Sequence, residues 1–139
     1  MNFRSDAVRA SCALILLLAF GLTGIAVSPA RAEPASSPSW GAIAAMSGWY
    51  GFSYNHASRE EAERTARAQC DRAAGRPGTC VVRAYFDRSC GALATGNYGE
   101  WGTALAPTAS DAGVAAVSEC DNHLPTEPCK LVVSVCSPR

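Results

Sequence analysis

Lysine is nearly absent from this sequence, since Lys130 is the only one in the chain. From residue 33 onward, nine Lys and Arg side chains stand against eleven Asp and Glu. The arginines between residues 59 and 72 alternate with acids, a pattern typical of a solvated helix face. A surface that binds nucleic acid or an anionic membrane needs clustered positive charge, so the composition excludes both as partners.

The motifs of several large enzyme classes are missing as well. The chain has no G-x-S-x-G, H-E-x-x-H, P-loop or dinucleotide-binding glycine pattern. Neither His56 nor His123 is accompanied by the C-x-x-C or H-x-x-x-H spacing of a zinc site. We therefore expect no metal and no cofactor, and no set of catalytic residues follows from motifs.

One long apolar run is present, and it lies near the N-terminus. Arg4 and Arg9 precede an apolar stretch over residues 12–27, which is followed by a small-residue cleavage site, Ala-Arg-Ala, at residues 30–32. We predict a signal peptide over residues 1–32. The run is short for a membrane-spanning helix, so we expect no membrane insertion after cleavage. The mature chain is then secreted, or kept in the periplasm or cell envelope.

Cysteine, by contrast, is abundant. An even number remains after cleavage, which in an exported chain predicts a disulfide framework. These cysteines are Cys70, Cys80, Cys90, Cys120, Cys129 and Cys136. The polar, proline-rich residues 33–39 are predicted to form a flexible leader, which leaves a single domain over residues 40–139.

The two halves of this domain resemble each other. The segment Gly-Ala-Ile-Ala that begins at Gly41 returns as Gly-Ala-Leu-Ala at Gly91. Self-similarity at a fixed interval indicates an internal repeat. We predict one unit at residues 40–89 and a second at residues 90–139.

Each unit is predicted to have the order strand, strand, helix, strand. In the first unit these are a hairpin of residues 41–45 and 49–55, a helix that starts at the Ser58–Glu61 capping box and runs to about residue 72, and a strand over residues 81–86. In the second unit they are strands over residues 91–95 and up to Trp101, a helix from the Thr108 cap to about Cys120, and a strand over residues 130–136.

Small residues are predicted to form the buried stripe of the first helix, namely Ala62, Ala66, Cys70 and Ala73. Comparison of the two copies indicates which side of the last strands faces the core: Val82, Ala84 and Phe86 in one, and Leu131, Val133 and Val135 in the other. We therefore predict an α+β fold in which the units form one antiparallel sheet of about six strands, with both helices on one face.

The repeat also selects among the fifteen pairings that six cysteines permit. Cys70 and Cys80 lie at the end of the helix and the start of the next strand, positions that Cys120 and Cys129 take in the second unit. The most economical pairing joins Cys70 to Cys80 and Cys120 to Cys129. This pairing leaves Cys90 for Cys136.

Several segments together resemble a known family. They are Trp40-Gly41-Ala42-Ile43-Ala44, the aromatic strand ending Tyr54-Asn55, the capped alanine-rich helix to Cys70, Cys80-Val81-Val82, Cys90-Gly91-Ala92-Leu93-Ala94 and the last strand closing on Cys136. Their order is similar to that of the bacterial exported family called domain of unknown function 4189, over essentially the whole mature chain. The resemblance implies a secreted or periplasmic module with no established activity and no defined catalytic residues.

Aromatic side chains are the best candidates for a binding surface. Trp49, Tyr98 and Trp101 lie in or beside the two predicted hairpins, where exposed rings can stack on sugars or contact a protein. Tyr50, Phe52 and Tyr54 share one strand face, and we expect them to belong to the core.

Histidine offers a rival site. His56 precedes the helix cap and lies close in sequence to Glu60 and Glu61. A His beside a carboxylate can serve a small secreted hydrolase. The helix dipole alone also explains carboxylates in a first helical turn.

These observations predict an exported, disulfide-stabilised interaction module without catalytic activity, whose partner is an unidentified protein or envelope glycan. The alternatives are a hydrolase that uses His56 and an inhibitor-type protein that acts through its loops. The sequence leaves the oligomeric state open.

Overall fold

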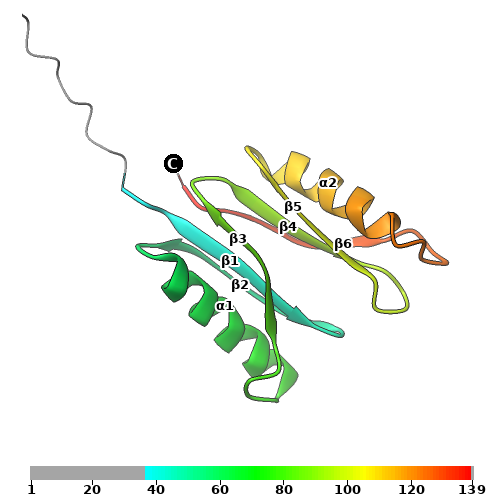
Figure 1. The fold of residues 1–139 in the computed structure, drawn as a ribbon, viewed down its shortest axis with the longest axis horizontal. Helices are drawn as coiled ribbons and strands as arrows, with labels where there is room; N and C mark the ends of the chain where they lie inside the picture. The colour runs from blue at the N-terminus through cyan, green and yellow to red at the C-terminus, as the bar shows by residue number, and fades with distance from the viewer. Residues whose placement is uncertain (1–36, 139) are drawn as a thin grey trace, which may run out of the picture. The chain divides into compact units, whose positions relative to one another are not determined.

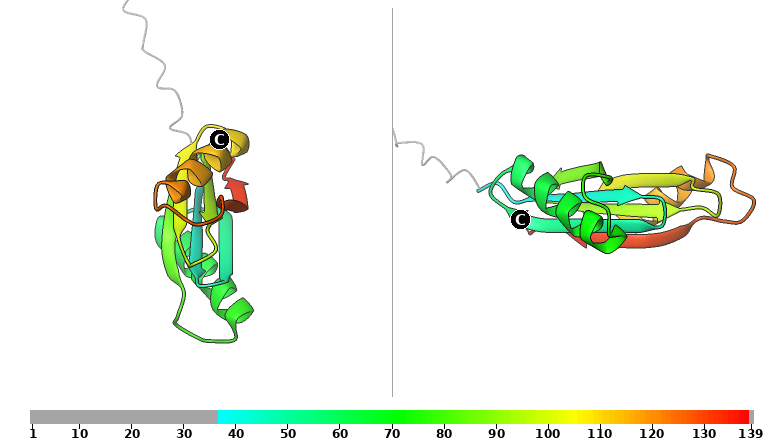
Figure 2. Two further views of the ribbon diagram at one scale, coloured as in Figure 1. Left: turned by 90° about the vertical axis from the view of Figure 1, so that its right-hand side faces the viewer. Right: turned by 90° about the horizontal axis from the view of Figure 1, so that it is seen from below.

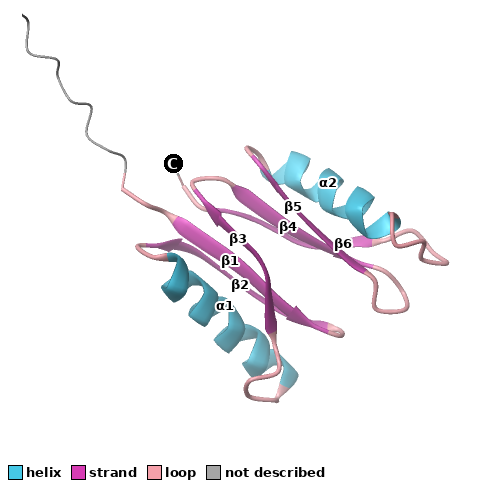
Figure 3. Ribbon diagram, viewed as in Figure 1, coloured by secondary structure: helices cyan, strands magenta, loops and turns pink. Residues whose placement is uncertain are grey.

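The computed structural model describes residues 37–138. The predicted signal peptide and most of the predicted leader lie outside the described residues. The first half contains β1 (Trp40–Met46), β2 (Trp49–His56), α1 (Arg59–Ala74) and β3 (Val81–Asp87). The second half contains β4 (Cys90–Thr95), β5 (Trp101–Ala106), α2 (Ala109–Asp121) and β6 (Lys130–Cys136). Both halves therefore have the same order of elements (Figure 3).

The strands form two antiparallel sheets, so the prediction of a single six-stranded sheet was wrong. One sheet has the strand order β2-β1-β3 and the other β5-β4-β6. The prediction that both helices share one face was wrong too, because α1 packs on the first sheet and α2 on the second, on opposite sides of the sheet pair (Figure 1). The inner faces of the two sheets pack against each other.

The two central strands explain this arrangement. On β1, Ala42 and Ala44 pack beneath α1, whereas Ile43 and Ala45 face the other sheet. A strand that is apolar on both faces has to be covered on both, and one layer of helices covers a single face. Each sheet therefore covers the inner face of the central strand of the other sheet.

Small residues let the helices approach the sheets closely. A Cβ at Gly51 would overlap the Ala66 carbonyl oxygen, and Gly102 lies in the same way beneath Cys120 of α2. The predicted stripe of α1 is buried at Ala62, Ala66 and Cys70. It is wrong at Ala73, which is exposed, because the i to i+4 spacing carries the stripe from Cys70 to Ala74.

Phe86 occupies the centre of the layer between the sheets. Its ring packs over two glycines, Gly41 of β1 and Gly91 of β4, and a Cβ at either glycine would collide with it. Ile43 and Leu93 are buried in the same cluster. The glycine that begins each repeated segment is therefore needed to admit one phenylalanine ring.

Two of the predicted core positions face the helices instead. A β-bulge in each sheet pairs Ala44 with Val82 and Ala94 with Leu131. Residues paired across strands point to the same side, so Val82 and Leu131 lie on the outer faces, and Leu131 packs beside Gly113 of α2. In each sheet the bulge reverses which side of the strand the residues before it face, so the inward alternation predicted for Val82 and Leu131 fails.

The aromatic strand β2 was also predicted incorrectly. Of the three rings predicted to belong to the core, only Phe52 packs against the inner cluster, whereas Tyr50 and Tyr54 are exposed. Because β2 is an edge strand, the facing sheet covers only part of it. In the second half, the strand expected to end at Trp101 begins there.

Three disulfides join Cys70 to Cys80, Cys120 to Cys129 and Cys90 to Cys136, the pairs that the repeat predicts. The first two connect the end of each helix to the following strand. In the third, Cys90 and Cys136 lie opposite each other on β4 and β6. The covalent links therefore hold both helix-to-strand loops and the start of the second sheet.

Asp71 organises the loop that the first disulfide closes. Its carboxylate accepts hydrogen bonds from the backbone N–H groups of Cys80 at 2.9 Å, Gly78 at 2.8 Å and Thr79 at 3.1 Å. These bonds, led by that of Cys80, lower the pKa of Asp71 below its ordinary value.

Replacing Asp71 by asparagine should therefore lower Tm at neutral pH. A depressed folded-state pKa contributes stability above the unfolded pKa of about 4, and this contribution is lost as pH falls through the lower folded value. Thermal unfolding followed by circular dichroism from neutral pH to below pH 4 should show a smaller acid-induced loss in Asp71→Asn than in the wild type. Glu119→Gln removes a surface carboxylate without such bonds and serves as control; an equal Tm change in both variants would contradict the assignment.

Candidate functional site

The two hairpin turns and the two disulfide-closed loops gather at one end of the folded domain, here called the hairpin end (Figures 1 and 2). The Thr79 hydroxyl lies 3.1 Å from the Met46 sulfur, and Asn97 Nδ2 donates to the Thr126 hydroxyl at 2.7 Å. At the opposite end, the hydroxyls of Ser39 and Ser137 are 3.2 Å apart. Both ends of the described chain therefore leave the domain away from the hairpin end.

A pocket of about 430 Å³ opens between the sheets at the hairpin end. A smaller pocket of about 110 Å³ adjoins it and shares Ala45, Met46, Gly48, Leu93 and Thr95. We call the two together the hairpin cleft. Beyond the shared residues, the side chains used below are Arg83, Glu100 and Trp101 in the larger pocket and Trp49, Tyr50 and Val132 in the smaller one.

Two tryptophans border the cleft because each begins an edge strand. Trp101 pairs with Thr95 across the second hairpin, and Trp49 pairs with Met46 across the first. The edge position leaves Trp49 50% and Trp101 40% exposed. Both of these sequence-predicted residues therefore belong to one surface, although they come from different sheets.

Arg83 is the bulged residue of β3 and lines the larger pocket. Its guanidinium lies over the Trp101 ring, 4.4 Å from the ring centroid, and joins the two sheets by a cation–π contact. Within residues 37–138, no carboxylate lies within ion-pairing distance of Arg83. The larger pocket thus contains a half-buried cation that has no ion-pair partner among residues 37–138.

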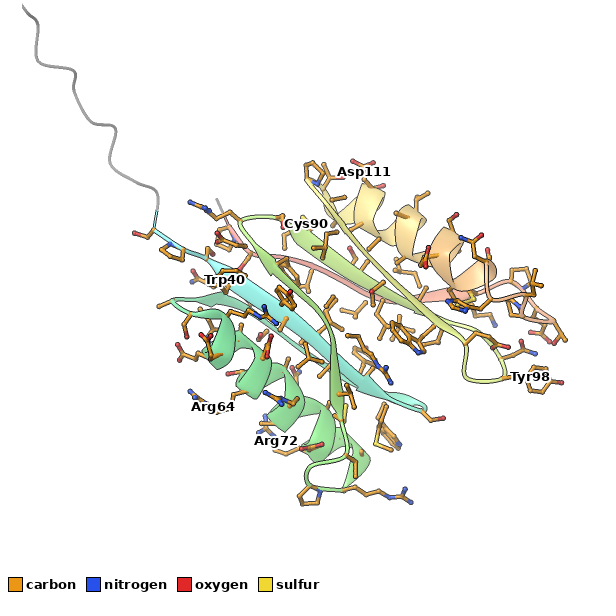
Figure 4. All side chains as sticks on the ribbon, viewed as in Figure 1. Trp40, Arg64, Arg72, Cys90, Tyr98 and Asp111 are labelled. Carbon is orange, nitrogen blue, oxygen red and sulfur yellow. A yellow bond between two sulfur atoms is a disulfide. The ribbon has the colours of Figure 1, made fainter. Side chains whose placement is uncertain are left out.

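Glu100 supplies a negative charge to the same pocket. Its Oε2 accepts a hydrogen bond from the backbone N–H of Tyr98 at 2.8 Å, which holds the carboxylate against the loop. Tyr98 itself, predicted as a binding residue, is 77% exposed at the outer end of this loop and is not among the residues that line the cleft (Figure 4).

His56 lies elsewhere, at the end of β2 that is remote from the hairpin turn. Its Nδ1 is 3.6 Å from Glu61 Oε1, a separation longer than a hydrogen bond. His56 does not line the hairpin cleft, so the structure does not bring it together with the tryptophans. Across the part of the chain that the structure describes, no three His, Cys, Asp or Glu side chains gather in a way that could hold a metal ion.

Sequence reasoning missed Arg83, Glu100 and Thr95. One signal could have identified Arg83: it aligns with Val132 of the second unit and is the charged residue within an otherwise apolar strand core. A charged residue in one half of the chain, at a position where the other half has an apolar residue, indicates a role other than core packing. No comparable signal identifies Glu100 or Thr95.

The comparisons with known proteins agree with this architecture. A family model described as Domain of unknown function (DUF4189) matches residues 40–136. The chain belongs to this family. A solved structure, the NMR structure of Rv1813c from Mycobacterium tuberculosis, is 22% identical, covers 96% of this chain and 99% of that chain, and has a TM-score of 0.53. At this identity the likeness of the DUF4189 domain to that structure concerns the fold alone.

A search of curated proteins found no match to this chain. Within residues 37–138, no helix is both long enough and apolar enough to cross a membrane.

Proposed function

We propose that this DUF4189 domain is an exported binding module without catalytic activity, and that the hairpin cleft is its binding surface. The observation that carries the proposal is that exposed rings line both adjoining pockets, Trp101 the larger one and Trp49 and Tyr50 the smaller one. The larger pocket also contains Arg83, which has no ion-pair partner within residues 37–138. Exposed aromatic and arginine side chains around a hollow are typical of recognition surfaces.

The disulfides support a binding role. Both helix-to-strand loops at the hairpin end are closed by a disulfide, and each loop is hydrogen-bonded to the adjacent hairpin. A surface fixed before binding loses less conformational entropy when it meets its ligand. Three disulfides also fit an oxidising compartment, so we place the mature protein outside the cytosol, secreted or in the envelope.

The partner we propose is an envelope glycan, with a protein as the alternative. The flat faces of tryptophan and tyrosine suit both, and the cleft offers polar groups beside them. An inhibitor-type protein would use the same end of the domain, because each disulfide-closed loop is hydrogen-bonded to the adjacent hairpin there. A hydrolase that uses His56 receives less support, since His56 lies away from the cleft and is beyond hydrogen-bond distance of Glu61.

Replacing both Trp49 and Trp101 by alanine should reduce retention on insoluble cell-envelope fractions at least about tenfold, because aromatic side chains at the centre of an interface dominate its energy. Retention is measured as the bound fraction of purified protein after sedimentation. Tyr54→Ala is the matched control, since it removes a 56% exposed ring of β2 that does not line the cleft. Equal retention of the double variant and wild type would refute the binding surface.

A further inference from the structure

We propose that the hairpin cleft binds a sugar that carries a carboxylate, with Arg83 holding the carboxylate and the exposed rings covering the apolar face of the sugar. This inference rests on the proposed binding function and adds the chemical class of the ligand. Three features of the cleft carry it: a cation without an ion-pair partner among residues 37–138, an acid that lines the same pocket, and exposed aromatic rings.

The cation is Arg83. Its guanidinium carbon lies over the Trp101 ring, and within residues 37–138 the group forms no ion pair, so its N–H donors remain for another partner. Two parallel donors of this kind match the two oxygens of a carboxylate. Because acids outnumber bases from residue 33 onward, this positive charge is local to the cleft and is not part of a general basic surface.

The acid is Glu100. It lines the same pocket as Arg83 without forming an ion pair with it. One carboxylate oxygen accepts the Tyr98 N–H, and the other remains available to a ligand hydroxyl. A fixed negative charge repels a second anionic group, so a single carboxylate suits this pocket better than a phosphate dianion or a polyanion.

The aromatic borders favour a sugar over other carboxylates. Trp101 lines the larger pocket, Trp49 and Tyr50 line the smaller one, and Thr95 lines both. A pyranose presents apolar C–H faces to rings and hydroxyls to neighbouring polar side chains. The volume of about 430 Å³ lies within the usual range of small-ligand sites. A peptide carboxyl end is usually captured by a nest of backbone N–H groups, whereas the polar groups used here belong to side chains.

The test uses two sugars that differ at one group. Glucuronate carries a carboxylate where glucose carries a hydroxymethyl group, so the pair isolates the contribution of the anion. Titration of the oxidised, ¹⁵N-labelled protein should shift amide resonances of the cleft, and glucuronate should bind about tenfold to a hundredfold more tightly than glucose. An acetylated dipeptide with a free carboxyl end, compared with its amide, tests the peptide alternative.

Arg83→Gln removes the charge from the pocket, so it should abolish the preference for glucuronate over glucose. Arg83→Lys keeps the charge without the planar fork and should retain part of the preference. Arg64→Gln removes an exposed charge of α1 that lies outside the cleft, and it should bind as the wild type does. Amide resonances of α2 report whether each variant is folded.

Each outcome bears on one statement. If Arg83→Gln keeps the preference for glucuronate, or if the wild type shows no such preference, the assignment of a carboxylate ligand is wrong. The proposed binding function is still supported in that case, provided that the double variant of Trp49 and Trp101 loses envelope retention. Tighter binding of the dipeptide than of glucuronate rejects the sugar class. If neither sugar perturbs the cleft resonances, the inference is overturned as a whole.

Discussion

Replacing Phe86 by alanine should lower the free energy of unfolding by about 3–5 kcal/mol, which is a large share of the roughly 5–15 kcal/mol that stabilises a typical domain. Phe86 is 2% exposed and fills the layer between the sheets, where its ring packs over Gly41 and Gly91. Neither glycine has a side chain that could close the resulting cavity. The two sheets would therefore lose their central contact.

Urea unfolding followed by far-UV circular dichroism measures this loss. Tyr98→Ala is the control, because it removes a similar ring at 77% exposure and should change stability by less than about 0.5 kcal/mol. Phe86→Leu keeps most of the volume and should give an intermediate value. A loss below about 1 kcal/mol for Phe86→Ala would mean that the sheets are held together by other contacts.

Breaking the disulfide between Cys90 and Cys136 should lower the free energy of unfolding by about 4 kcal/mol. This bond closes a loop with a sequence separation of 46, so it removes more entropy from the unfolded chain than either of the other two bonds does. The bridges with separations of 10 and 9 are each expected to contribute roughly 2.5–3 kcal/mol on the same estimate. The longer bridge also joins β4 to β6, the centre and the edge of the second sheet.

Cys136→Ala is the cleanest variant, because Cys136 is exposed and its truncation removes little packing. The remaining Cys90 is 3% exposed and therefore protected from new pairings. The double variant with Cys90→Ala should be nearly as stable as Cys136→Ala alone, because one bridge can be broken only once. Losses that add across the two positions would show that packing, and not the covalent link, provides the stability.

Local chemistry predicted the elements well. Ser58 and Thr108 cap the two helices by accepting the N–H of Glu61 and Asp111, as the capping boxes indicate. The predicted strand over residues 130–136 coincides with β6. These features depend on neighbours within a few residues, which a single sequence contains.

The layer order could not be obtained from the same reasoning. The apolar residues on both faces of β1 and β4 indicated that both faces are buried. The prediction nevertheless placed helices on one face of the sheet and left the other face without a packing partner. The bulge opposite Ile43 and Ala44 was a second obstacle, since one extra residue moved Val82 to the outer face and placed Arg83 at the cleft. Bulges leave little trace in a strand that is apolar on both sides.

The binding surface was found only in part for the same reason. Trp49 and Trp101 could be recognised from the sequence because large rings beside predicted turns are unusual. Arg83 and Glu100 could not, because they line one pocket only after the two sheets have packed together. His56 and Tyr98 were equally visible in the sequence, yet they lie outside the cleft.

The sequence by itself determined the elements, the small residues beneath the helices and the choice of cysteine partners, because each of these follows from spacing along one chain or from comparison of its two halves. Only the tertiary structure decided that the halves stack face to face and that the hairpin turns meet around a charged cleft. Stacking depends on which apolar face finds a complementary surface, here Phe86 over Gly41 and Gly91, and that match joins residues far apart in the chain.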